Sequence, residues 1–277
     1  MNRSIRAIAV LFALLVFVPA RADVLVLIHG YMGSAASWET SGVGAVLAAN
    51  GWAPAGVQAG IQYLPGPGQE APNRYYTVEL PSLAPLMIQA DQLQLELQQI
   101  AGRHPGEPMI LAAHSAGGVV ARIVLVRGGA PGVRTLITIA SPHLGTMQAV
   151  AALDATDSSG PFGFIKDFFG GSLYHTVKSS WGALLDLTPA APGNLLFWLN
   201  RQPHPDIRYV SVLRTGPVGL GDELVPAFSQ DMNNVPALRG RSERVTAAAG
   251  HALLPGDGEM LVRLMTEQGE SAAGGAK

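Results

Sequence analysis

Short apolar segments alternate along the chain with longer segments in which apolar residues recur at helical spacing. The first apolar segment, Val24–Ile28, is continuous, which is typical of a strand in a parallel sheet that is buried on both faces. The other segments predicted as strands are Tyr75–Leu80, Met109–Ala113, Leu136–Ala140, Arg208–Leu213 and Val245–Ala249. The chain therefore carries the strands of a largely buried sheet.

Helices are predicted between these strands. The clearest is Leu83–Arg103, whose apolar residues follow the period of a helix until Pro105 and Gly106 stop it. The others are Ser37–Ala49, Val119–Val126 and a closing helix that contains Met260–Met265. Residues 53–72 are rich in glycine and proline, which predicts a loop. Strands that alternate with helices predict an α/β fold with a doubly wound, mostly parallel sheet.

The first 22 residues have the pattern of a secretory signal peptide. Arg3 and Arg6 precede an uninterrupted apolar run of 12 residues, and Ala20-Arg21-Ala22 is a small-residue cleavage site. The run is shorter than the roughly 20 apolar residues that cross a membrane comfortably, and an uncleaved N-terminal anchor is the alternative. We expect cleavage after Ala22, location in the periplasm or outside the cell, and one domain over residues 23–277.

The amino-acid composition of the chain excludes several classes of function. The chain has 277 residues, of which 48% are apolar, so it can bury an ample core and is not intrinsically disordered. Eighteen basic and twenty acidic residues give a net charge of −2 without a long basic run, which argues against nucleic-acid binding. The absence of cysteine excludes a thiol nucleophile and disulfides. No metal-binding or phosphate-binding motif is present, so we expect no cofactor.

The strongest chemical signal lies where the predicted strand Met109–Ala113 meets the helix Val119–Val126. There the chain reads Ala113-His114-Ser115-Ala116-Gly117. A nucleophile elbow needs a serine at the apex of a sharp strand-to-helix turn, with small residues on both sides. Ala113 replaces the first glycine of the usual pattern, and its methyl group is still small. The pattern favours Ser115 as a nucleophile over a serine that only caps the helix.

A second signal is His29-Gly30-Tyr31-Met32-Gly33, directly after the first buried strand. An acyl-transfer enzyme holds the oxyanion of its tetrahedral intermediate with preorganised N–H donors. One donor is the N–H of the residue after the nucleophile, here Ala116, and the other comes from the loop after an early strand. We expect the second donor to be the N–H of Tyr31, and His29 to be a structural hydrogen-bonding group.

Together these motifs resemble the α/β-hydrolase superfamily, and more closely the bacterial secreted lipases and esterases with an Ala-His-Ser-x-Gly elbow. Two further stretches add to the resemblance, Ser141-Pro142-His143-Leu144-Gly145 and Asp222-Glu223-Leu224-Val225-Pro226. It covers roughly residues 24–265 but rests on four short motifs. The resemblance implies the α/β-hydrolase fold with a cap or lid insertion, and ester hydrolysis by a serine nucleophile.

The resemblance also implies that an acid follows a late strand. Asp222 lies nine residues beyond the predicted strand Arg208–Leu213, in a loop with flanking glycine. Its rivals are Glu223, which is adjacent, and Asp231. We predict that Asp222 is the acid of the triad.

The general base is expected after the last strand. His251 follows Val245–Ala249 and Gly250, and a neutral imidazole can accept the serine proton near neutral pH. His143 is the competitor because it also follows a strand, but it precedes the acid. Some relatives hold a structural calcium ion near this loop. Asp257 is a single acid, so we expect no metal here.

Residues 146–206 lie where relatives carry the cap. They hold five of the eight phenylalanines and two of the four tryptophans. The candidate substrate-binding residues in this segment are Phe162, Phe168, Phe169 and Trp181. They either line the entrance and select apolar acyl chains, or fill the core under the insertion.

The sequence therefore predicts an exported serine hydrolase that cleaves carboxylic esters of apolar acyl chains, with Ser115, His251 and Asp222 as its triad. Its partners would be an ester or lipid substrate and, transiently, a lipid surface. A thioesterase, an amidase or a polyester depolymerase on the same triad is the alternative. A non-catalytic lipid-binding protein is a further alternative, although a binding module does not need an elbow. Oligomeric state is not predicted.

Overall fold

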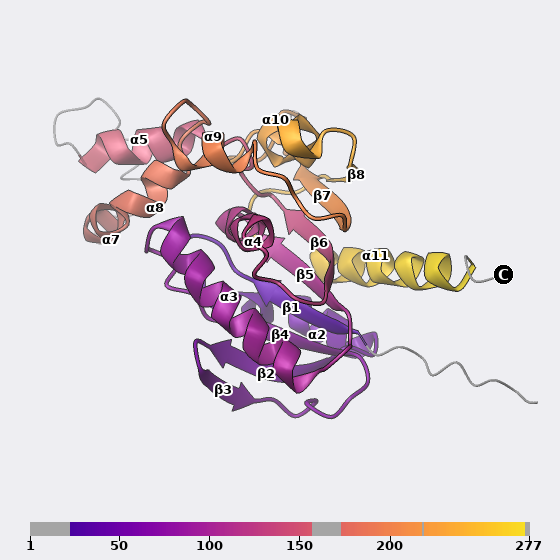
Figure 1. The fold of residues 1–277 in the computed structure, drawn as a ribbon. Coiled ribbons are helices and arrows are strands. Elements are labelled where there is room, and N and C mark those ends of the chain that lie inside the picture. Colours follow the sequence, from indigo (N-terminus) through magenta and orange to yellow (C-terminus); the bar gives the residue numbers. More distant parts are fainter. Residues whose placement is uncertain (1–22, 157–172, 218, 275–277) are drawn as a thin grey trace, which may run out of the picture.

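The computed structural model describes residues 23–156, 173–217 and 219–274. In this part of the chain eight strands form one sheet in the order β3-β2-β4-β1-β5-β6-β7-β8 (Figure 1). The strands are β1 Val24–Ile28, β2 Ala53–Ala59, β3 Gln62–Pro65, β4 Arg74–Val78, β5 Met109–His114, β6 Val133–Ile139, β7 Arg208–Arg214 and β8 Ser242–Ala247. Neighbouring strands are parallel except β2 and β3. The predicted doubly wound, mostly parallel sheet is confirmed.

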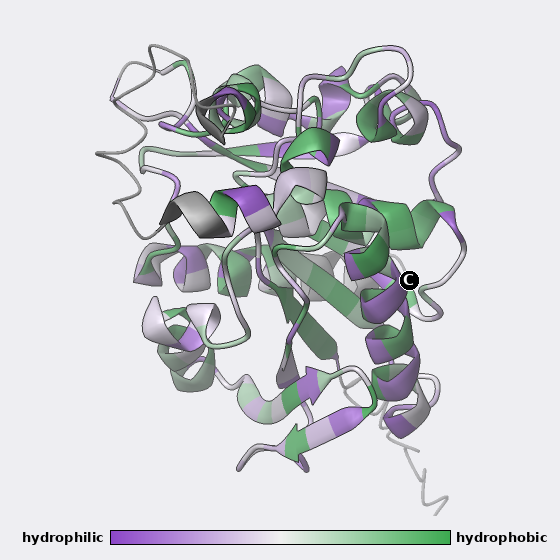
Figure 2. Ribbon diagram, turned by 90° about the vertical axis from the view of Figure 1, so that its left-hand side faces the viewer, coloured by the Kyte–Doolittle hydropathy of each residue, from purple (hydrophilic) through white to green (hydrophobic). Residues whose placement is uncertain are grey.

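Strand β1 lies between β4 and β5 and is buried along its whole length. Val24, Val26 and Ile28 pack into the core on the side of helices α3 and α4, whereas Leu25 and Leu27 pack on the side of α1, α2 and α11. Figure 2 shows this apolar interior between the helix layers. The strand has no polar position because successive side chains point to opposite faces and both faces are covered.

The helices flanking the sheet are α1 Ser37–Thr40, α2 Val43–Ala49, α3 Leu86–Arg103, α4 Ala116–Val126 and α11 Pro255–Gly274. The single helix predicted over Ser37–Ala49 is wrong, because Gly42 adopts a φ of 83° between α1 and α2. That left-handed conformation is readily available to glycine and interrupts a helix.

The loop predicted over residues 53–72 is wrong in part, since it contains β2 and β3. Strand β2 pairs with β4 through its backbone, with an irregularity between Pro54 and Gly56, and β3 returns antiparallel to it. Backbone pairing needs no apolar alternation, and an irregularity near the sheet edge accommodates proline and glycine. Strand β8 likewise begins earlier than predicted, at Ser242, because the edge position leaves its polar side chains half-exposed or exposed.

Between β6 and β7 the described residues, 140–156 and 173–207, form helices. They are α5 Met147–Thr156, α7 Leu173–Ser179, α8 Trp181–Asp186 and α9 Leu195–Leu199. They lie together beyond the end of the sheet where β5 and β6 finish (Figure 1). After β7 come α10 Ala227–Gln230 and the short 3₁₀ helices Met232–Asn234 and Pro236–Leu238. Among the described helices, none is both long and apolar enough to cross a membrane.

Candidate active site

Ser115 stands at a sharp turn between β5 and α4. Its φ is 52° and its ψ is −130°, a conformation that is strained for a residue with a side chain. The turn is possible because its neighbours are small. A Cβ at Gly117 would overlap the carbonyl oxygen of His29, and one at Gly118 would overlap the hydroxyl of Ser141. Ala113 is fully buried in β5, so its methyl group is accommodated.

The loops after β7 and β8 bring an acid and a histidine to this serine. The Nε2 atom of His251 lies 2.9 Å from the Oγ atom of Ser115. The Nδ1 atom of the same imidazole lies 3.1 Å from Oδ2 of Asp222. Three residues widely separated in the sequence thus form one continuous hydrogen-bonded chain. The structure thus brings together the residues that the sequence predicted as nucleophile, base and acid, and their roles stay a prediction.

The carboxylate of Asp222 is inaccessible to solvent. Its Oδ1 atom accepts hydrogen bonds from the N–H groups of Leu224, at 2.8 Å, and Val225, at 2.7 Å. Burial raises the pKa of Asp222, but the hydrogen bond and the charge of His251 and the two backbone donors outweigh burial and hold it below its ordinary value. The carboxyl group therefore stays ionised at neutral pH and can stabilise an imidazolium.

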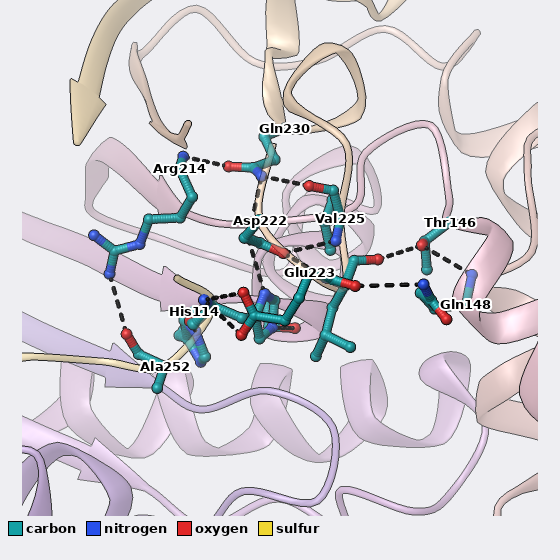
Figure 3. Close-up of polar contacts among 12 residues, drawn as sticks. His114, Thr146, Gln148, Arg214, Asp222, Glu223, Val225, Gln230 and Ala252 are labelled. Carbon is teal, nitrogen blue, oxygen red and sulfur yellow. Dashed lines mark hydrogen bonds and ion pairs between the residues drawn. The ribbon is translucent and has the colours of Figure 1, made fainter. Parts of the chain in front are cut away.

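Gln230 is a neighbour of Asp222 that the sequence did not reveal. Its Nε2 atom donates to Oδ2 of Asp222 at 3.2 Å and to the carbonyl oxygen of Val225 at 2.7 Å, and its Oε1 atom accepts the N–H of Arg214 at 2.7 Å (Figure 3). The amide thus ties the end of β7 to the loop that carries the acid. No sequence motif predicts this role of Gln230, because its contact with Asp222 depends on where α10 lies in the folded chain.

The rival residues have other partners. Glu223 accepts the backbone N–H of His251 and not its imidazole. Asp231 accepts the N–H of Asn233 and lies 3.5 Å from Arg244. The Nε2 atom of His143 is 3.1 Å from the hydroxyl of Thr138. Burial and the charge of Arg122 hold the pKa of His143 well below its ordinary value.

The predicted oxyanion loop lies against the elbow. A Cβ at Gly30 would come within 2.7 Å of the Cβ of Ser115 and 3.3 Å of the backbone nitrogen of Ala116. Only glycine allows this approach. Within the described ranges the N–H groups of Tyr31 and Ala116 donate no hydrogen bond to a protein atom, and Ala116 opens α4, where helical N–H groups have no partner in the helix. Their use as oxyanion donors stays a prediction.

The other histidine and tyrosine contacts around this loop are structural. The Nε2 atom of His29 accepts the N–H of Leu80 at 3.0 Å, as expected for a structural hydrogen-bonding group. The hydroxyl of Tyr31 lies 2.6 Å from the hydroxyl of Ser180, which donates to the carbonyl oxygen of Val177. The side chain of Tyr31 therefore joins the oxyanion loop to the start of α8.

Two open cavities adjoin the site. One, of about 340 Å³, includes Tyr31, Met32, His114 and Leu253 in its lining. The other, of about 490 Å³, lies beside Asp222 and is walled by apolar side chains. These apolar residues are Leu144, Met147, Pro189, Leu220, Leu224, Pro226 and Phe228.

Of the candidate substrate-binding aromatics, Trp181 opens α8 and is half exposed. Phe162, Phe168 and Phe169 lie outside the described residues. The sequence-based choice between an entrance lining and a core filling therefore stays open for them.

Asp257, considered as a calcium ligand, has a different partner. Its Oδ2 atom lies 2.6 Å from the Nη2 atom of Arg214, and both side chains are buried. The described residues contain no group of three histidine or acidic side chains arranged to hold a metal ion.

The comparisons with known proteins agree with this architecture. A family model described as a PGAP1-like alpha/beta domain matches residues 86–158, about a quarter of the chain. No curated protein matches the sequence. Among solved structures, the chain is similar to the mature form of the lipase BlEst2 from Bacillus licheniformis, with a TM-score of 0.58 and 16% identity over 90% of this chain and 92% of that one.

A lipase-esterase related protein from Clostridium acetobutylicum is also similar, with a TM-score of 0.52 and 12% identity over 89% of this chain and 94% of that one. A gene product from Listeria innocua has a TM-score of 0.52 and 14% identity over 82% and 86% of the two chains. At such identities the likeness establishes the fold. The chain has the α/β-hydrolase fold, as its motifs predicted.

Proposed function

We propose that this protein is a serine hydrolase that cleaves carboxylic esters of apolar acyl chains. The observation that carries the proposal is the hydrogen-bonded chain from Ser115 Oγ through the imidazole of His251 to Asp222. A serine at a strained elbow, with a base and a buried ionised acid in line, is the arrangement that nucleophilic acyl transfer needs. A non-catalytic lipid-binding protein has no use for that strain or for a buried carboxylate.

The reaction follows from these positions. His251 Nε2 accepts the proton of Ser115 as Oγ bonds to the acyl carbon, and the N–H groups of Tyr31 and Ala116 stabilise the oxyanion. The imidazolium, held by Asp222, then donates that proton to the departing alcohol as the ester C–O bond breaks. Water, deprotonated by His251, attacks the acyl-enzyme, and the carboxylic acid leaves as Ser115 regains its proton.

The apolar walls beside the acid support an apolar substrate. Met147, Leu220 and Phe228 expose 65%, 76% and 62% of their surfaces around the larger cavity. Exposed apolar side chains that gather beside a cavity are typical of sites that bind apolar ligands or contact a lipid surface. We extend the proposal to substrate binding by Phe162, Phe168, Phe169 and Trp181, and to export after removal of residues 1–22.

The decisive experiment labels and assays one serine. The wild-type protein should hydrolyse p-nitrophenyl esters and be labelled by a fluorophosphonate at Ser115. Ser115→Ala should lose the label and about a factor of 10⁶ in kcat while remaining folded. More than a few per cent of residual turnover in a folded Ser115→Ala protein would reject Ser115 as the nucleophile. A higher kcat/KM for thioesters or amides than for esters would reject carboxylic esters as the preferred substrate class but would leave the proposed triad unchanged.

A further inference from the structure

The backbone of His251 is held on both sides by side chains outside the proposed triad. Its N–H donates to both carboxylate oxygens of Glu223, at 3.1 and 3.2 Å. Its carbonyl oxygen lies 2.8 Å from Nε2 of His114 and, since a carbonyl only accepts, that nitrogen carries the hydrogen. Figure 3 shows Glu223 and His114 together beside Asp222. The two peptide groups that flank the Cα atom of His251 are therefore both held by side chains.

The loop after β7, which carries Asp222 and Glu223, is itself held by hydrogen bonds from residues near the start of α5. The carbonyl oxygen of Glu223 accepts from Nε2 of Gln148 at 3.3 Å, and the carbonyl oxygen of Leu224 accepts from the hydroxyl of Thr146. Gln148 lies in the first turn of α5, and Thr146 directly precedes that helix (Figure 3). At the other end, a Cβ at position 250 would come within 3.1 Å of Glu223 Oε2, so Gly250 leaves room for the carboxylate.

We propose that Glu223 is a positioning residue for the base. Its carboxylate accepts the hydrogen bond of the His251 N–H and so places the imidazole between Ser115 and Asp222. This inference rests on the proposed function. Adjacent carboxylates then have separate tasks: Asp222 orients the imidazole ring, and Glu223 orients the peptide from which that ring projects. Placement matters because a displacement of about 1 Å can reduce a rate by about a hundredfold.

Glu223 also adds a second negative charge near the imidazolium that forms during the reaction. Among the described residues, Asp222 and Glu223 from the loop after β7 and His114 from β5 contact His251, and Arg214 at the end of β7 donates to the carbonyl oxygen of the adjacent Ala252. Burial and the neighbouring His251 lower the pKa of His114 to about 3, so His114 stays neutral over the pH range of an activity assay. The negative charges beside the imidazolium are therefore those of Asp222 and Glu223.

The test compares three substitutions. Glu223→Ala should lower kcat about tenfold and leave KM within about twofold, because the hydrogen bond acts on the base and not on substrate. Glu223→Gln keeps an acceptor oxygen without the charge, so it should recover most of that loss in kcat. The matched control is Glu259→Ala, an exposed glutamate on α11, which should behave as wild type.

The split between kcat and KM separates positioning from a structural role. The loss in Glu223→Ala should appear in kcat, with KM close to the wild-type value, and Glu223→Gln should recover most of it. The melting temperature should stay close to that of Glu259→Ala. A Glu223→Ala protein with wild-type kcat, or one whose loss of activity only follows its loss of folded protein, would overturn the inference.

Failure of this inference and failure of the proposed function give different results. If the wild-type protein is active and Ser115→Ala is not, full activity in Glu223→Ala rejects only the positioning role. If Ser115→Ala remains as active as the wild type, the triad itself is rejected. The rate at which a fluorophosphonate labels Ser115 provides a second readout, which should fall in Glu223→Ala and not in Glu259→Ala.

Discussion

The two halves of the site are built by different means. The nucleophile half, Ser115 and the loop after β1, lies at the middle of the sheet and is held by close backbone packing, with glycines where a Cβ would collide with the neighbouring chain. The acid–base half, in the loops after β7 and β8, lies toward one edge of the sheet and is held by side-chain hydrogen bonds from Gln230, Glu223 and His114.

This difference between close backbone packing and side-chain hydrogen bonding predicts which substitutions each half tolerates. At the middle of the sheet both faces are covered, so small residues determine where the backbone can go. Toward the edge the chain leaves the sheet in loops whose polar backbone groups need partners. The nucleophile half should therefore be sensitive to added volume, and the acid–base half to the loss of a charge or an acceptor.

Of the substitutions that test this difference, Asp222→Asn in the acid–base half should have the largest effect. The amide cannot hold the imidazole in the correct tautomer, so kcat should fall by up to about 10⁴ with little change in fold. Steady-state kinetics on a soluble ester measure the effect. Asp231→Asn is the matched control, because Asp231 bonds Asn233 and not the imidazole, and should cost little. Equal losses in the two variants would contradict the assignment of Asp222.

The next effect should appear in stability. Asp257→Asn removes the charge that faces Arg214 at 2.6 Å, with both side chains buried. An unpaired buried charge costs about 3–5 kcal/mol, so the free energy of unfolding in urea should fall by that order. Asp206→Asn is the control, since its contact with Arg241 at 3.4 Å is exposed and should contribute nothing measurable. Similar unfolding midpoints for both variants would mean that the buried ion pair contributes little to the stability of the fold.

In the nucleophile half, Gly30→Ala adds only a methyl group. That group would meet the Cβ of Ser115 at 2.7 Å and the carbonyl oxygen of His114 at 2.9 Å, so the oxyanion loop must move away. Loss of a well-placed donor reduces kcat by about 10²–10³, and we expect a loss of that size. Gly102→Ala should be harmless or stabilising, since it lies in α3 with nothing within 4 Å of its Cβ. Near-wild-type kcat in Gly30→Ala would show that close packing does not position the donor.

The smallest effect should come from Tyr31→Phe, which keeps the backbone N–H and removes the hydroxyl bonded to Ser180. Loss of one hydrogen bond should cost about 1 kcal/mol of stability and leave kcat within about threefold. Thermal unfolding and ester kinetics measure both quantities. A hundredfold loss of kcat would instead identify the hydroxyl, and not the N–H, as the group that contacts the oxyanion.

Much of the fold could be predicted from the sequence because its signals are local. The continuous apolar run Val24–Ile28 identifies a strand buried on both faces, and the small residues around Ser115 fit the strained turn found there. Strands β2 and β3 could not be predicted, since β2 is held by backbone pairing with β4 and β3 by backbone pairing with β2, and not by an alternation of their own side chains. The break at Gly42 was not visible in the apolar pattern because it depends on the backbone conformation of that glycine.

In the site, the sequence by itself determined which residue types and order were available: a serine at an elbow, acids after a late strand and a histidine after the last one. Only the tertiary structure decided what each of the two adjacent carboxylates contacts. It directs Asp222 to the imidazole and Glu223 to the peptide of the same histidine. The physical reason is that the direction of a side chain in an irregular loop is set by its hydrogen bonds to nearby backbone groups. Here the carboxylate of Asp222 accepts the N–H groups of Leu224 and Val225, and no sequence period encodes such contacts.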